Sequence, residues 1–259
     1  MTTRPRGAVS LARALSKLGL ASRAEATVLV RDGRVRVDGR VVRNAEFPVV
    51  PERAHIAIDG RSAARPPSLT ILLHKPRGVV VTRHDPEGRP TVLDLVSGSQ
   101  GRVMPVGRLD LATSGLLLLT NDSRFAAWIT DPANAVVRTY AVTAKGEVGD
   151  QALERLRSGV LEGGTLLRAA AIELRKRSGR ETHLLVELLE GKNREIRRLF
   201  RAVGHDVTRL KRVAFGGLTL GDLPAGKWRE LSAEELRRAF PGAPLRTRER
   251  ASAPGRLEF

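Results

Sequence analysis

Residues 107–122 read GRLDLATSGLLLLTND. The four consecutive leucines at 116–119 are typical of a strand that is covered on both faces, so they predict a buried strand over 115–120. Arg108 and Asp110 stand just before that strand, in a segment flanked by glycines. Two interpretations of Asp110 stay open at this point: a catalytic carboxylate at the mouth of a buried strand, or an acid in an ordinary loop ion pair or turn.

The chain on either side of this strand alternates between strand and helix patterns. Further strands are predicted at 69–74, 79–82, 136–144, 168–174, 182–189 and 207–214. Helices are predicted at 122–130, 150–158, 193–203 and 232–239. Long β segments with a few separate helices favour an α+β fold over a regular βαβ array.

Residues 9–61 form a smaller unit of their own. A short apolar helix ends at Gly19, and the capping box of Ser22 and Glu25 opens a second helix. An Asp-Gly pair inside the alternating segment 34–42 indicates a hairpin. We divide the chain into a basic arm at 1–8, this unit, a linker at 62–68, a main domain at 69–240 and a disordered basic tail at 241–259.

The composition narrows the classes of function. The 259 residues carry 45 Lys and Arg against 28 Asp and Glu, a formal charge of +17, which indicates a polyanionic partner such as nucleic acid. With no cysteine, the chain has no disulfide, thiol nucleophile or iron–sulfur cluster. Its longest run without a charged residue, 111–121, is too short to span a membrane, and no signal peptide is evident. We therefore expect a soluble, cytoplasmic protein.

Several catalytic motifs are absent from the sequence. No two glycines are separated by a single residue, so no dinucleotide-binding G-x-G-x-x-G loop occurs, and there is no Walker A or G-x-S-x-G motif. The five histidines do not have metal-ligand spacing. We expect neither a cofactor nor a metal.

The predicted helix 193–203 carries two stripes on roughly opposite faces. The apolar stripe is Ile196, Leu199, Phe200 and Val203, and the basic stripe is Arg194, Arg197, Arg198 and Arg201. Arg197 lies nearest the apolar stripe, so it can bend toward an interior cleft while the others face solvent or phosphate. A solvated face is the alternative, although only Glu195 is nearby to balance the charge. The single tyrosine, Tyr140, is either a core residue or a ring on which a base stacks.

Together these segments resemble the RsuA/RluB family of ribosomal-RNA pseudouridine synthases, over roughly residues 9–240. The likeness is carried by segments 19–23 and 33–39 of the small unit, 73–78, 107–122, Tyr140 and 190–199. It implies an S4-like α/β RNA-binding domain followed by a mixed, mainly antiparallel catalytic sheet with flanking helices. Segments 85–92 and 193–195 resemble the branch that acts on large-subunit RNA.

The resemblance implies isomerisation of uridine to pseudouridine without a cofactor. Asp110 would be the catalytic carboxylate, Arg197 its ion-pair partner, and Tyr140 the ring that stacks on the uracil. RNA contacts are expected from Arg108, Arg13, Lys17, Ser22, Arg23, Arg34, Arg36, Lys75, Arg194, Arg198 and Arg201. The partner would be ribosomal RNA or a precursor ribosomal subunit, bound by a monomer away from any membrane. The alternatives are a non-catalytic RNA-binding assembly factor and a synthase for small-subunit RNA.

Overall fold

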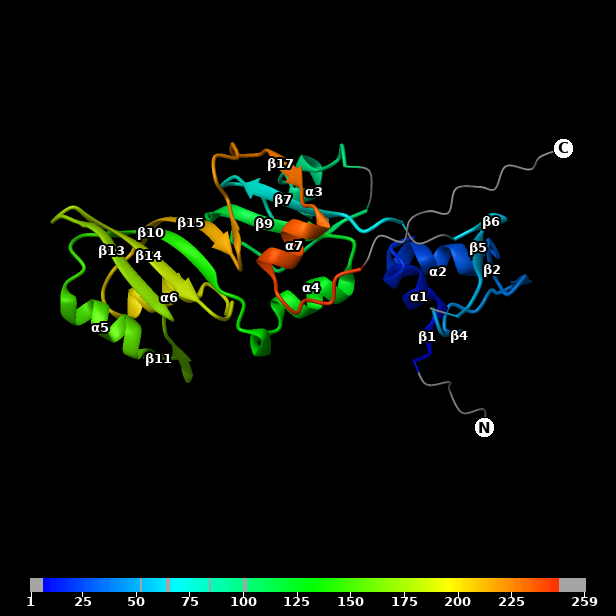
Figure 1. The fold of residues 1–259 in the computed structure, drawn as a ribbon, viewed down its shortest axis with the longest axis horizontal. Coiled ribbons are helices and arrows are strands. Elements are labelled where there is room, and N and C mark those ends of the chain that lie inside the picture. Colours follow the sequence, from blue (N-terminus) through cyan, green and yellow to red (C-terminus); the bar gives the residue numbers. More distant parts are fainter. Residues whose placement is uncertain (1–6, 52, 64–65, 84, 100–101, 247–259) are drawn as a thin grey trace. The chain divides into compact units, whose positions relative to one another are not determined.

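The computed structural model describes residues 7–51, 53–63, 66–83, 85–99 and 102–246 (Figure 1). The chain divides after Ser68 into two compact units. The arm expected at 1–8 and the tail expected at 241–259 lie largely outside the described residues, and so do residues 64–65 of the linker. In the part of the chain that is described, no helix is both long and apolar enough to cross a bilayer.

The first unit packs two helices beside short strands. Its elements are β1 (Val9–Ser10), α1 (Leu11–Lys17), α2 (Arg23–Arg31), β2 (Val35–Val37), β3 (Arg40–Val41), β4 (Pro48–Val49), β5 (Ile56–Ile58) and β6 (Arg61–Ser62). A four-stranded sheet has the order β3-β2-β5-β6, and β1 pairs with β4. Leu11, Leu15, Ala26 and Val30 are fully buried between the helices and the sheet.

The capping box predicted from Ser22 is present at the start of α2. The Ser22 hydroxyl accepts a hydrogen bond from the Glu25 amide at 3.2 Å, and the Ser22 amide donates to the Glu25 carboxylate at 2.7 Å. Ser10, which caps α1, makes no such side-chain bond. We expect Ser22→Ala to lower the free energy of unfolding by about 1 kcal/mol and Ser10→Ala to change it little, as measured by denaturant titration. Equal losses in the two variants would contradict this assignment.

The second unit is built on a nine-stranded sheet. Its strands are β7 (Thr70–Lys75), β8 (Met104–Pro105), β9 (Ser114–Thr120), β10 (Arg138–Lys145), β13 (Ala171–Arg177), β14 (Glu181–Leu188), β15 (Val207–Phe215), β16 (Leu218–Thr219) and β17 (Trp228–Glu230). The order is β13-β14-β10-β15-β9-β7-β17, with β16 beside β15 and β8 beside β9. Every pairing is antiparallel except that of β15 with β9. This confirms the mixed, mainly antiparallel sheet.

The helices cover both faces of this sheet. They are α3 (Val92–Leu95), α4 (Ser123–Thr130), the 3-10 turn η1 (Pro132–Asn134), α5 (Asp150–Ser158), α6 (Glu195–Ala202) and α7 (Ala233–Ala239). Leu117 and Leu119 belong to one core, with apolar residues of α3, α5 and α6, while Leu116 and Leu118 belong to a second core with α4 and α7. All four leucines are fully buried, as the opening stretch of sequence predicts.

A short parallel pairing joins two antiparallel parts of the sheet. One part is β13-β14-β10-β15 and the other is β9-β7-β17, and they lie to either side of this junction in Figure 1. The pairing matches Lys211 with Ser114 and Arg212 with Gly115. Gly115 has φ +111°, and a Cβ there would lie 2.2 Å from the carbonyl oxygen of Arg212. Only glycine lets the two backbones approach this closely.

Several segments differ from the sequence-based prediction. Helix α3 and the short strands β8, β16 and β17 were not predicted, and β13 begins and ends three residues beyond the predicted strand 168–174. The segment 79–82 forms only an isolated bridge from Val80 to Thr91. A hairpin of β11 (Val160–Glu162) and β12 (Thr165–Leu167) was not predicted; its turn is a Gly-Gly pair with positive φ. Helix α6 begins at Glu195 rather than 193 because Arg194 is left-handed, with φ 48°. Residues 241–246, assigned to a disordered tail, continue the fold: Leu245 packs on the second core.

Candidate active site

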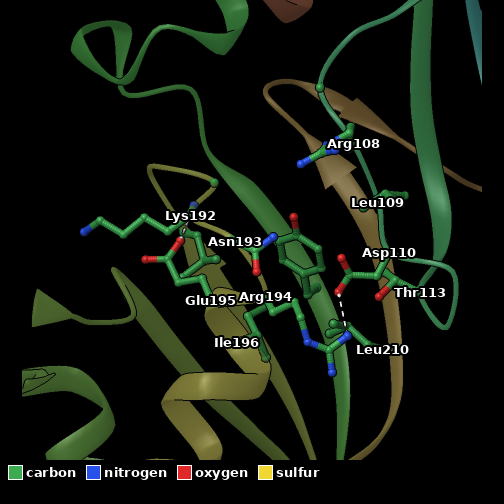
Figure 2. A pocket seen from close by; sticks show the side chains of 14 residues that line it. Arg108, Leu109, Asp110, Thr113, Lys192, Asn193, Arg194, Glu195, Ile196 and Leu210 are labelled. Carbon is green, nitrogen blue, oxygen red and sulfur yellow. Dashed lines mark hydrogen bonds and ion pairs between the residues drawn. The ribbon is translucent and has the colours of Figure 1, made fainter. Parts of the chain in front are cut away.

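The central feature of the second unit is a cavity of about 290 Å³ beside the β9–β15 junction (Figure 2). Asp110 enters it from the loop between β8 and β9, Tyr140 from β10, and Arg194 from the loop before α6. Leu109, Leu188 and Leu210 supply its apolar wall. The cavity therefore combines a carboxylate, an aromatic ring and cationic groups from segments that are far apart in the sequence.

Asp110 is paired with Arg194. The Asp110 Oδ2 atom lies 3.7 Å from Nη1 of Arg194, and the two side chains keep 32% and 48% of their surface exposed (Figure 2). At this distance and exposure the pair is a weak, water-screened contact. It leaves the carboxylate open to a molecule entering the cavity.

Arg197, predicted to pair with Asp110, takes a different place. Its Nη1 donates to the carbonyl of Val207 at 2.7 Å and its Nη2 to that of Ala112 at 3.4 Å. Burial lowers the pKa of Arg197, an effect that Arg194 strengthens and Asp110 opposes. Arg197 does bend inward, as its position on the helix predicts. Its hydrogen bonds, however, go to backbone carbonyls of β15 and of the loop before β9, and not to Asp110. The loop residue before α6 is the one that reaches the carboxylate.

Lys75, predicted to contact RNA, is fully buried at the end of β7. Its ammonium donates to three carbonyls: those of Pro76 at 3.0 Å, Asp110 at 3.1 Å and Thr113 at 2.9 Å. Three acceptors match the three donors of a charged lysine. Burial lowers the pKa of Lys75 to about 8, while the Asp110 charge opposes the shift. Lys75 thus holds the loop before β9 at two points, the carbonyls of Asp110 and Thr113. Because its ammonium is buried, it cannot contact an RNA phosphate.

Glu195, a second carboxyl in the cavity wall, was not predicted as a site residue. It is 3% exposed, its Oε2 accepts from the Lys192 amide at 3.0 Å, and its Oε1 has no partner. Burial raises the pKa of Glu195, and the nearby Glu190 carboxylate adds to that rise. Glu195 begins α6 after the left-handed N-cap Arg194, which makes no side-chain cap bond, so no sequence motif marks it.

Only some arginines of the basic stripe on α6 are available to bind RNA. Arg198 donates through Nε to the Glu162 carboxylate and through Nη2 to the Glu162 carbonyl at 3.2 Å, whereas Arg201 is exposed. The hairpin that was not predicted supplies this acid, so Arg198 is less available for RNA than the sequence suggests. Arg108 is exposed at the rim of the cavity.

Five of the six RNA-contact candidates in the first unit lie on its surface, namely Arg13, Lys17, Arg23, Arg34 and Arg36. Ser22 is instead committed to the capping box. Arg34 forms a two-point pair with Asp59, at 2.8 and 2.6 Å, with both side chains about half exposed. Across the described ranges, no group of three or more His, Cys, Asp or Glu side chains could hold a metal ion.

Comparison with known proteins agrees with this geometry. The family model for RNA pseudouridylate synthases matches residues 69–202, and the S4 domain model matches residues 9–53. The ribosomal large subunit pseudouridine synthase B of Bacillus subtilis is 37% identical over 230 residues, covering 88% of this chain and 94% of its own. The protein of that name from Escherichia coli K12 is 41% identical over 232 residues, covering 85% and 78%.

A solved structure gives the same result. The crystal structure of a pseudouridylate synthase superposes with a TM-score of 0.61 at 25% identity, covering 89% of this chain and 99% of its own. The family model spans more than half of the chain, and the relatives match over most of it. The chain, with its N-terminal S4 domain, therefore belongs to the RNA pseudouridylate synthase family.

Proposed function

We propose that this protein isomerises a uridine of ribosomal RNA, and that its substrate is large-subunit RNA. The observation that carries the proposal is the partly exposed Asp110 carboxylate, which lines one cavity together with Tyr140, Arg108 and Arg194. The names of the relatives from Bacillus subtilis and Escherichia coli support the choice of large-subunit RNA. The proposal extends to a monomer that acts in the cytoplasm on ribosomal RNA or a precursor subunit.

The reaction breaks the bond from uracil N1 to ribose C1′ and forms a bond from C5 to C1′. One proton leaves C5 and one is gained at N1, so atoms balance without an oxidant or water. The target nucleotide must leave the RNA stack, which costs a few kcal/mol. Stacking on the Tyr140 ring offsets about 1–3 kcal/mol of that cost. Arg108, at the rim, is placed to hold the gap left in the RNA.

Asp110 acts as the ionised carboxylate at the sugar–base bond. The chain holds it from two sides, since Lys75 binds the Asp110 carbonyl and Arg194 lies beside its side chain. Such fixed groups contribute by orienting the reacting carboxylate before the substrate arrives. Arg194 is the side chain that can compensate changes in charge at Asp110 during the reaction.

The experiment that tests this function is pseudouridine mapping at nucleotide resolution. Unmodified transcripts of large- and small-subunit ribosomal RNA are incubated with the purified full chain. We expect one new pseudouridine, in the large-subunit RNA. Modification of the small-subunit RNA alone would overturn the substrate assignment and keep the chemistry. Tight binding with no modification of either transcript or of precursor subunits would support the assembly-factor alternative.

The S4 domain is expected to supply salt-dependent affinity. Arg34→Ala combined with Arg36→Ala should weaken RNA binding and make the plot of log affinity against log salt shallower by up to about 2. The paired change Arg237→Ala with Arg238→Ala, on exposed positions of α7, serves as the control. Binding titrations at several salt concentrations measure both quantities. An equal loss of slope in the two double variants would contradict a specific role for the S4 face.

A further inference from the structure

A second cavity, of about 260 Å³, adjoins the one that holds Asp110. The two share Arg108, Tyr140 and Lys192 among their lining residues. A group bound in the second cavity therefore lies next to a base stacked on Tyr140. The mechanism described above makes no use of this space.

Two buried arginines line the second cavity. Arg138, on β10, is 5% exposed and Arg212, on β15, is 3% exposed. The strand register pairs Arg212 with Tyr140, and Arg138 with Phe215. The two guanidinium carbons lie 5.1 and 4.9 Å from the centre of the Phe215 ring. The sheet thus places two cations next to the stacking residue.

No carboxylate among the described residues pairs with either arginine. Arg138 donates to the carbonyls of Val136, Leu189 and Ile129, at 2.7 to 3.2 Å. Arg212 donates through Nε to the carbonyl of Leu116 at 2.7 Å. Burial lowers the pKa of Arg138 and the charge of Arg212 adds to the shift, while Tyr140, Glu195 and Glu190 oppose it. Two like charges are therefore buried side by side with neutral carbonyls as their hydrogen-bond partners, an arrangement that favours an anion.

One hydrogen-bond donor of Arg212 is unused. Its Nη2 atom is buried and has no hydrogen-bond partner. Glu190, the one carboxylate that lines the second cavity, is already bound to the Lys192 ammonium. A guanidinium presents its donors in a planar fork that matches the oxygens of a phosphate group. Arg212, which lines the cavity, can present this fork to a phosphate that enters it.

We propose that the second cavity is a subsite for an RNA phosphate that flanks the target uridine, with Arg212 as its principal ligand. The proposal rests on the proposed function for the identity of the base in the first cavity. Arg108, at the boundary of the two cavities, adds a further exposed cation, whereas the Lys192 ammonium is already paired with Glu190. Holding this phosphate fixes the sugar of the extruded nucleotide relative to Asp110.

Mononucleotides test the subsite without requiring turnover. The full chain is titrated with uridine, uridine 5′-monophosphate, uridine 3′-monophosphate and inorganic phosphate, and NMR follows the arginine side-chain N–H signals. We expect one of the two monophosphates to bind at least 10-fold more tightly than uridine, with a shift of the Arg212 signal. The loss of a signal in Arg212→Lys identifies it. Equal affinities of uridine and both monophosphates would overturn the proposal.

Two variants sharpen the comparison. Arg212→Met should lower the affinity for the monophosphate to that for uridine and leave the affinity for uridine unchanged. Arg209→Met, at an exposed position of the same strand, should leave the tighter binding of the monophosphate intact. An advantage that persists in Arg212→Met overturns the proposal. If Arg212→Met does not fold, the wild-type titration still decides. Failure of uridine to bind while phosphate shifts the Arg212 signal would count against the proposed function and not against the phosphate subsite.

Discussion

Asp110→Asn is expected to reduce turnover by on the order of 10³-fold or more and to leave RNA affinity within about 2-fold of wild type. The amide has nearly the shape of the carboxylate but lacks its charge and its nucleophilicity. Asp110 makes one side-chain contact among the described residues, the 3.7 Å pair with Arg194, so little structure depends on its charge. Initial rates of pseudouridine formation and equilibrium RNA binding measure the two effects.

The matched control is Asp222→Asn, at an exposed position in the same unit. It should keep wild-type rates. If Asp110→Asn retained more than a tenth of wild-type turnover, Asp110 could not be the reacting carboxylate. A parallel loss of RNA affinity would instead assign Asp110 to binding.

Lys75→Met is expected to lower the catalytic rate by about 10²-fold, with RNA affinity nearly unchanged. Methionine fills similar space but leaves the carbonyls of Asp110 and Thr113 without their buried donor. A shift of the reacting group by about 1 Å costs on the order of 10²-fold in rate. Lys176→Met, at an exposed position of β13, is the control. A rate within 3-fold of wild type for Lys75→Met would show that the loop holds its position without this ammonium.

The pH dependence separates this positioning role from a general loss of stability. Above its pKa of about 8, neutral Lys75 has two hydrogens for three carbonyls, so wild-type turnover should decline as the pH rises through about 8. Its pKa is lower in the folded chain than the ordinary 10.5, so between these values the unfolded chain holds more protons. The Lys75 contribution to the free energy of unfolding then rises with pH, so the titration of Lys75 does not itself destabilise the fold where turnover declines. A decline at the same pH in Lys75→Met would contradict this assignment.

Local patterns predicted the framework of the fold well. The leucine run, the capping box of Ser22 and the helices at α4, α5 and α7 are each specified by a few neighbouring residues, and the structure confirms them. The resemblance placed Asp110 and Tyr140 as site residues, and the structure brings them into one cavity although 30 positions separate them.

The polar contacts of the site could not be predicted from the sequence, because they depend on tertiary structure. Arg194 reaches Asp110 because its left-handed backbone shortens α6, a conformation that periodicity alone does not specify. Arg198 is neutralised by Glu162, whose hairpin has too short a pattern to be recognised. Lys75 appeared to be a surface cation at the end of a strand, but the loop after β8 covers it.

The two-residue parallel pairing of β9 and β15 has a mechanical consequence. Asp110 and Lys75 are attached to the β7–β9 part of the sheet, while Tyr140, Arg194 and Arg212 are attached to the β10–β15 part. The candidate active site is thus assembled across the shortest pairing on the path β13-β14-β10-β15-β9-β7-β17. A fluctuation that separates β9 from β15 would move Asp110 away from Tyr140 and Arg194, while each part of the sheet kept its own strand pairings. Loss of activity can therefore precede global unfolding.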